Sequence, residues 1–167
     1  MKLEIIISGG QSGADRAALD WAIAHDVPHG GWCPKRRRAE DGPLSAQYRL
    51  DETPTANYLQ RTEWNIRDSD ATVIFSIAPK LTGGSLKTAA LAKKHGKPLL
   101  HLSAIAPDPH AKALREFMTA NRIRRLNVAG PRASKEPEIA AFVRTIMDQT
   151  FEAIAANPIR TRKQHEE

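Results

Sequence analysis

The sequence predicts an α/β domain built on a mainly parallel sheet of about five strands, with helices on both faces. Short apolar runs alternate with amphipathic segments along the 167 residues, which is the pattern of parallel strands joined by helices. A chain of this length usually forms one domain with a single sizeable core. No internal repeat or linker interrupts the pattern. We therefore expect one domain over residues 1–156, followed by a polar tail over residues 157–167.

Strands are expected where apolar, β-branched runs are too short to form helices. The runs LEIIIS and ATVIFSI are of this kind, and HGGWC is a shorter candidate that contains two glycines. The expected strands cover residues 3–8, 29–33, 71–77, 98–103 and 123–129.

Helices are expected between these strands, where apolar residues recur at helical spacing. Trp21 lies on the apolar stripe of the first helix and is expected in the core, and Gly96 ends the third helix. Ser12 and Asp15 have the spacing of a capping box, which makes Ser12 the expected N-cap of the first helix. The expected helices cover residues 14–25, 56–68, 85–95, 110–121 and 136–156.

Charge and composition favour an anionic partner. The chain has a net charge of +6 and a pI near 9.7, which suits a phosphorylated small molecule or a nucleic acid, although a basic surface can also be simply solvated. The single cysteine, Cys33, excludes an internal disulfide and is expected as a small buried hydrophobe rather than a soft metal ligand. No membrane span and no signal peptide are found in the sequence, so we expect a cytoplasmic protein.

The first glycine-rich stretch, SGGQSG, follows the first expected strand and opens the first helix. Free N–H groups and the helix dipole at such a turn favour an anion, so we expect ligand contacts there. The spacing matches neither the dinucleotide fingerprint nor a Walker A loop. Valine at Gly10 is expected to leave the fold intact and to abolish ligand retention. The candidate residues are Gly9, Gly10, Gln11, Ser12, Gly13, Asp15 and Arg16.

A second glycine-rich stretch, KLTGGSLKTA, also follows a buried strand and opens a helix. Two such turns on one parallel sheet usually lie at the same edge, where they would form two anion-binding walls. The alternative is two independent structural turns. The candidate residues here are Thr82, Gly83, Gly84, Ser85 and Thr88.

Residues 34–55 form a long segment without periodicity, which is uncommon unless it is functional or mobile. It contains a basic run whose arginines suit a bidentate grip on phosphate; the candidates are Lys35, Arg37 and Arg38. Arg61, Asn65 and Asp68 share one polar helix face, for which we favour a solvent-facing position, at least for Arg61 and Asp68. Arg132 and Lys135 add charge after the last strand, and Trp32 or Trp64 could stack on a ring.

Five blocks of the sequence resemble the molybdenum cofactor carrier protein family, the circularly permuted YpsA-like branch of the SLOG superfamily. They are SGGQSGADRAALDWA, GWCPKRRRAEDG, ETPTANYLQRTEWNIRDSDATVIFS, LTGGSLKTA and LNVAGPRASKEP. The resemblance implies a Rossmann-like domain that self-associates and carries molybdenum cofactor (a phosphorylated molybdopterin), with molybdoenzymes as recipients. It assigns both glycine loops and the basic residues Lys35, Arg37 and Arg38 to the site. Arg36 departs from the family pattern, in which glycine is commoner.

Related LOG-type enzymes hydrolyse nucleoside monophosphates with a signature acid, and that position is Ala90 here. We therefore favour a binding protein with no catalytic residues and no metal site of its own, although Asp15, Glu40 and Asp41 could act as acids. A nucleotide-processing protein is the alternative. A nucleic-acid binder is the second alternative, and the 5% aromatic content argues against it.

Overall fold

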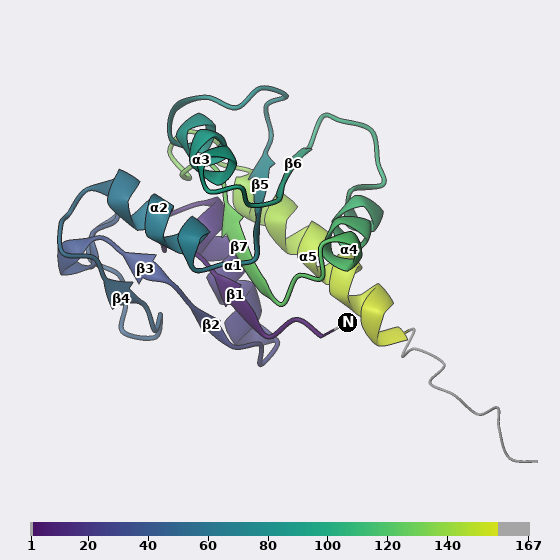
Figure 1. The fold of residues 1–167 in the computed structure, drawn as a ribbon, viewed down its shortest axis with the longest axis horizontal. Helices are drawn as coiled ribbons and strands as arrows, with labels where there is room; N and C mark the ends of the chain where they lie inside the picture. Colours follow the sequence, from purple (N-terminus) through teal and green to yellow (C-terminus); the bar gives the residue numbers. More distant parts are fainter. Residues whose placement is uncertain (1, 157–167) are drawn as a thin grey trace, which may run out of the picture.

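The computed structural model describes residues 2–156, and the predicted polar tail lies outside the described residues. Its main sheet has five parallel strands in the order β2-β1-β7-β5-β6 (Figure 1). The prediction of a single α/β domain with a parallel sheet is confirmed. The strands are β1 (Ile5–Ile7), β2 (His29–Gly30), β5 (Ala71–Ser76), β6 (Leu99–Ser103) and β7 (Arg125–Ala129).

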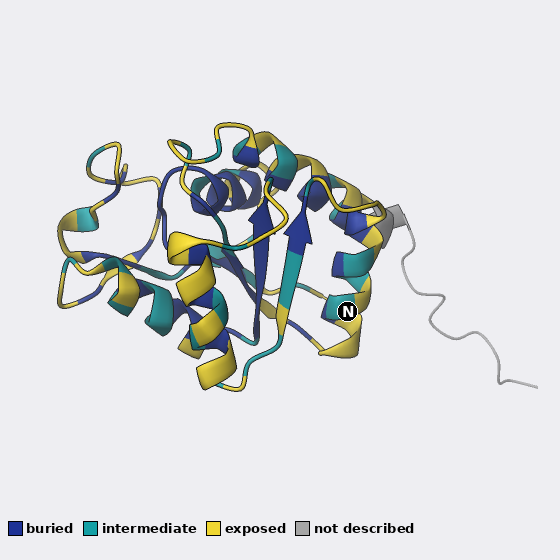
Figure 2. Ribbon diagram, turned by 90° about the horizontal axis from the view of Figure 1, so that it is seen from above, coloured by how far each residue is buried: buried dark blue, intermediate teal, exposed yellow. Residues whose placement is uncertain are grey.

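Five helices cover both faces of the sheet, as predicted. Helix α5 packs against both α1 and α4 on one face, while α2 and α3 pack together on the other. Strand β5, in the interior of the sheet, is buried at all six positions (Figure 2), as expected of a strand covered on both sides. The helices are α1 (Ala14–Ala24), α2 (Tyr58–Arg67), α3 (Gly83–Lys94), α4 (His110–Ala120) and α5 (Ile139–Ala156).

The main core lies between the sheet and helices α1, α4 and α5. Phe75, Leu114 and Leu126 are fully buried within it. Trp21 is 4% exposed, which confirms its predicted place in the core, and its indole N–H donates to Asp148 at 2.8 Å.

Residues 34–55 are held by a second, smaller core rather than forming an open loop. Cys33 is fully buried in this cluster, in agreement with its interpretation as a small hydrophobe. The backbone is further fixed by Arg37, whose guanidinium donates to the carbonyls of Leu44, Ser45 and Tyr48 at 3.1, 2.8 and 2.7 Å. The cluster consists of Leu19, Cys33, Ala39, Leu44, Tyr48 and Leu50.

The predicted strand over residues 29–33 is split in two by Gly31. Strand β2 pairs with β1, whereas β3 (Trp32–Cys33) pairs with β4 (Asp51–Glu52) in a separate two-stranded sheet. Gly31 has φ +127°, and a Cβ there would lie 2.6 Å from the Ser8 carbonyl oxygen. The prediction of one continuous strand is therefore wrong. The chain passes from one sheet to the other at Gly31, because glycine readily adopts this positive φ and other residues do not.

We expect Gly31→Ala to lower the free energy of unfolding by roughly 3 kcal/mol, because it adds both backbone strain and a steric clash. Gly42→Ala is the matched control, since Gly42 also has a positive φ but a Cβ there meets nothing within 4 Å. It should cost about 1 kcal/mol. Urea unfolding of both variants measures the difference, and equal losses would contradict a role for close packing at Gly31.

Candidate functional site

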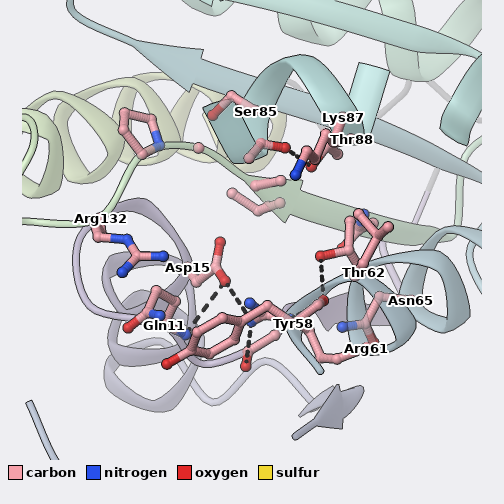
Figure 3. Close-up of a pocket in the computed structure, with 18 of the residues that line it drawn as sticks. Gln11, Asp15, Tyr58, Arg61, Thr62, Asn65, Ser85, Lys87, Thr88 and Arg132 are labelled. Carbon is pink, nitrogen blue, oxygen red and sulfur yellow. Dashed lines mark hydrogen bonds and ion pairs between the residues drawn. The ribbon is translucent and has the colours of Figure 1, made fainter. Parts of the chain in front are cut away.

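A pocket of about 460 Å³ lies at the carboxyl edge of the main sheet, where ligands of parallel α/β sheets usually bind. It is lined by the segment after β1, the start of α3, one side of α2 and the segment after β7 (Figure 3). Both glycine-rich stretches contribute, the first through Gly9 and Gln11 and the second through Gly84 and Ser85. The structure thus brings the two loops to one cavity.

The sequence-predicted candidates divide into two groups. One group lines the pocket: Gly9, Gln11, Asp15, Arg38, Thr82, Gly84, Ser85 and Thr88. The other group lies outside its lining: Gly10, Ser12, Gly13, Arg16, Lys35, Arg37 and Gly83.

Ser12 does not cap helix α1, so the predicted capping box is wrong. Gly13 is the N-cap residue and no side chain caps the helix. The Ser12 hydroxyl instead donates to Glu40 and accepts a hydrogen bond from the Ala133 N–H at 3.1 Å. The Ser12 hydroxyl therefore accepts from the backbone of Ala133 instead of from the first turn of α1, and it joins the first glycine loop to two other loops.

Gly10 faces the small core rather than the pocket. It has φ +78°, and a Cβ there would lie 2.6 Å from Leu44 Cδ1. A β-branched residue is strongly disfavoured at this φ. The expectation that Gly10→Val leaves the fold intact is therefore wrong.

Most of the basic site candidates serve the fold more than the pocket. The Arg16 guanidinium, from α1, pairs with Asp41 at 2.9 Å and donates to the Gly10 carbonyl at 3.1 Å. Arg37 holds the backbone of residues 44–48, and Lys35 is exposed. Of the four basic site candidates Arg16, Lys35, Arg37 and Arg38, only Arg38 lines the pocket, with its guanidinium 4.4 Å from the Tyr58 ring centre.

The polar face of α2 points into the protein, so the solvent-facing position predicted for Arg61 is wrong. Arg61 and Asn65 are 7% and 2% exposed. Arg61 Nη1 donates to the Gly9 carbonyl at 2.8 Å and to Asp15 Oδ2 at 3.2 Å. Asn65 holds the backbone of Trp32 through both ends of its amide. Asp68 is half-buried and accepts from the Trp32 indole N–H at 2.8 Å.

Several lining residues were not among the sequence-predicted candidates. The sequence did contain a signal for α2, because its pocket-lining polar residues recur at helical spacing, but the same spacing is typical of a solvated face. Trp32 and Trp64 pack edge-to-face on each other at 4.8 Å and do not line the pocket, whereas Tyr58 does. The additional polar residues are Asn57, Tyr58, Arg61, Thr62, Asn65, Lys87, Asn127, Arg132 and Lys135.

The pocket is strongly basic. Its described lining contains five cationic side chains and one carboxylate, that of Asp15. Burial raises the pKa of Asp15 to about 6, although the Arg61 charge opposes this shift. Burial also lowers the pKa of Arg61, which still leaves a guanidinium charged at neutral pH. The cationic residues are Arg38, Arg61, Lys87, Arg132 and Lys135.

Two further observations concern metals and membranes. Among the described residues, no group of three or more His, Cys, Asp or Glu side chains could hold a metal ion. Within the same part of the chain, no helix combines the length and apolar character needed to cross a bilayer.

We expect sulfate to bind the pocket about fivefold more tightly at pH 5 than at pH 7.5, because protonation of Asp15 removes a nearby negative charge. Asp15 is mostly ionised above its pKa of about 6 and mostly protonated below it, whereas sulfate keeps its charge over this range. Isothermal titration measures the affinity. Asp15→Asn should show a flat profile, and an affinity that falls toward acid pH in the wild type would contradict the assignment.

Comparison with known proteins agrees with the fold and identifies a family. The circularly permuted YpsA SLOG family matches residues 6–151. A crystal structure of a protein from Syntrophus aciditrophicus SB, described as a "Putative molybdenum carrier protein", is 44% identical to this chain. The match covers 89% of this chain and 94% of that one, with a TM-score of 0.86. No curated protein matches. Since the family match spans most of the described residues, the chain belongs to the circularly permuted YpsA family of SLOG proteins.

Proposed function

We propose that this protein is a carrier of molybdenum cofactor that holds the phosphorylated pterin in the pocket between the two glycine-rich loops. The observation that supports this most directly is the convergence of both loops and five cationic side chains on one cavity of about 460 Å³. A cavity of this size suits a small organic ligand. The description of the 44% identical relative as a molybdenum carrier points to the same cargo.

The phosphate is proposed to bind at the start of α3. Gly84 and Ser85 lie in the first turn of this helix and line the pocket, and the free N–H groups of a helix N-terminus favour an anion. Lys135 stands beside them, with Nζ donating to Thr82 Oγ1 at 2.6 Å, and Arg132 lines the same cavity. A phosphate there would meet backbone donors on one side and cationic side chains on the other.

The pterin ring is proposed to lie over the remaining floor of the pocket, near Tyr58. Arg38, Arg61 and Arg132 each place the guanidinium carbon within 5.5 Å of the Tyr58 ring centre, so this floor offers flat π surfaces as well as charge. We further propose that the protein is cytoplasmic, that it forms a homo-oligomer and that it delivers the cofactor to molybdoenzymes.

We expect Gly84→Asp to abolish ligand retention without destabilising the fold. A Cβ at Gly84 meets nothing within 4 Å, and an acidic residue is favourable in the first turn of a helix, but its carboxylate would repel a phosphate at this wall. The measurement is molybdenum and pterin content after anaerobic incubation with the cofactor and desalting.

Leu86→Asp is the matched control. It adds the same charge to the same turn of α3, but Leu86 is 55% exposed and does not line the pocket. It should retain the cofactor at the wild-type level. If the Gly84→Asp variant also retains cofactor normally, or if the wild type retains none, the proposed carrier site is wrong.

A nucleotide-processing enzyme is the alternative, and one observation favours it. Asp15 lines the pocket with a pKa of about 6, so it can hold a proton close to neutral pH, as a general acid must. Ala90, at the position of the LOG-type acid, is exposed on α3. Release of free base from nucleoside monophosphates, lost in Asp15→Asn, would support the enzyme; no release from the common nucleotides would exclude it.

A further inference from the structure

One oxygen of the Asp15 carboxylate accepts hydrogen bonds from the protein, and the other oxygen is open to the pocket. Oδ2 accepts hydrogen bonds from the Gln11 backbone N–H at 3.3 Å and from Arg61 Nη1 at 3.2 Å. No residue in the described part of the chain donates to Oδ1. Figure 3 shows that this second oxygen points away from Gln11 and Arg61, into the space below Ser85 and Thr88.

A half-satisfied carboxylate is unexpected in a cavity built for an anion. The Asp15 side chain is only 10% exposed, and Oδ1 is not among the buried side-chain atoms that lack a partner, so this oxygen is accessible to a ligand in the pocket. A phosphate in contact with the ionised carboxylate would be unfavourable, because two anions repel. The part of the ligand that faces Asp15 must therefore donate hydrogen bonds.

A second unsatisfied polar atom lies on the same wall. Gln11 Nε2 is buried and has no hydrogen-bond partner among the described residues. The orientation of this amide is fixed by its other end, because Oε1 accepts from the backbone N–H groups of Ser12 and Glu40 at 3.0 and 2.9 Å. Gln11 lines the same pocket as Asp15, so a ligand carbonyl that reached Nε2 would remove the cost of leaving this donor unpaired.

We propose that Asp15 and Gln11 recognise the 2-amino-4-oxopyrimidine edge of the bound heterocycle. On this edge an exocyclic amino group and a ring N–H, both donors, stand beside a carbonyl acceptor. Asp15 Oδ1 accepts from the two donors, and Gln11 Nε2 donates to the carbonyl. Pterin and guanine share this edge. The proposal rests on the proposed function and adds to it the orientation of the ligand, with the phosphate at the start of α3 and the amino edge at Asp15.

The test compares pterin with lumazine, a pteridine that carries an oxygen in place of the 2-amino group. The wild type should bind pterin at least about tenfold more tightly, which is the usual effect of a hydrogen bond to a charged group. In Asp15→Asn the amide oxygen should stay on Arg61 and Gln11, which turns the amide N–H2 toward the ligand. That variant should therefore prefer lumazine. Quenching of ligand fluorescence measures both affinities.

Controls separate recognition from a structural effect. Asp26→Asn makes the same change at an exposed residue after α1, outside the pocket lining, and should keep the wild-type preference. Binding of inorganic phosphate to Asp15→Asn should be equal to or tighter than that of the wild type, which shows that the pocket is intact. A wild type that does not distinguish the two pteridines, or an Asp15→Asn variant that still prefers pterin, overturns the inference.

The result is also independent of the carrier proposal. If the wild type retains no cofactor but still prefers pterin to lumazine, the carrier proposal is rejected and the recognition of the edge stands. If it retains the cofactor but does not prefer pterin, the carrier proposal stands and the recognition of the edge is rejected. Guanosine monophosphate is the arm that identifies the source of the edge: tighter binding than a pterin monophosphate assigns the site to a guanine nucleotide, and weaker binding assigns it to a pterin.

Discussion

The buried ion pair between Asp15 and Arg61 is the interaction on which the pocket depends. Arg61 comes from α2 and reaches both the Asp15 carboxylate and the Gly9 carbonyl, so one guanidinium joins the first glycine loop to the opposite face of the sheet. Both side chains are at least nine-tenths buried. Replacing either side chain by an apolar one would leave the other charge buried without a hydrogen-bond partner, which is far costlier than the pair itself.

This pair also sets the electrostatic polarity of the cavity. Arg61 lowers the pKa of Asp15 by less than burial raises it, so that this pKa stays at about 6. The other cationic side chains of the lining come from the segment after β3 (Arg38), from α3 (Lys87) and from the segment after β7 (Arg132 and Lys135). The result is a basic pocket whose described lining contains a single carboxylate, which favours an anionic ligand that also offers a hydrogen-bond donor to Asp15.

The basic segment after β3 shows how local charge can mislead. From the sequence alone, its arginines are as well suited to bind phosphate as to stabilise the fold. In the structure, Arg37 binds backbone carbonyls, and Asp41 of the same segment pairs with Arg16 of α1. These contacts, together with the small core around Cys33 and Leu44, shape a long connection that has little regular structure. Only Arg38 remains for the pocket.

The sequence by itself determined the alternation of strands and helices, because apolar periodicity is a local property that survives in any tertiary context. It also placed two glycine-rich turns at carboxyl ends of strands, and their meeting at one edge follows from parallel topology. Tertiary structure alone decided which side chains face the cavity. The Ser12 hydroxyl donates to Glu40, Gly10 faces Leu44, and Arg61 points inward and pairs with Asp15. Each of these outcomes depends on a partner about 28 to 46 residues away, and neither propensity nor spacing along one element encodes such a contact.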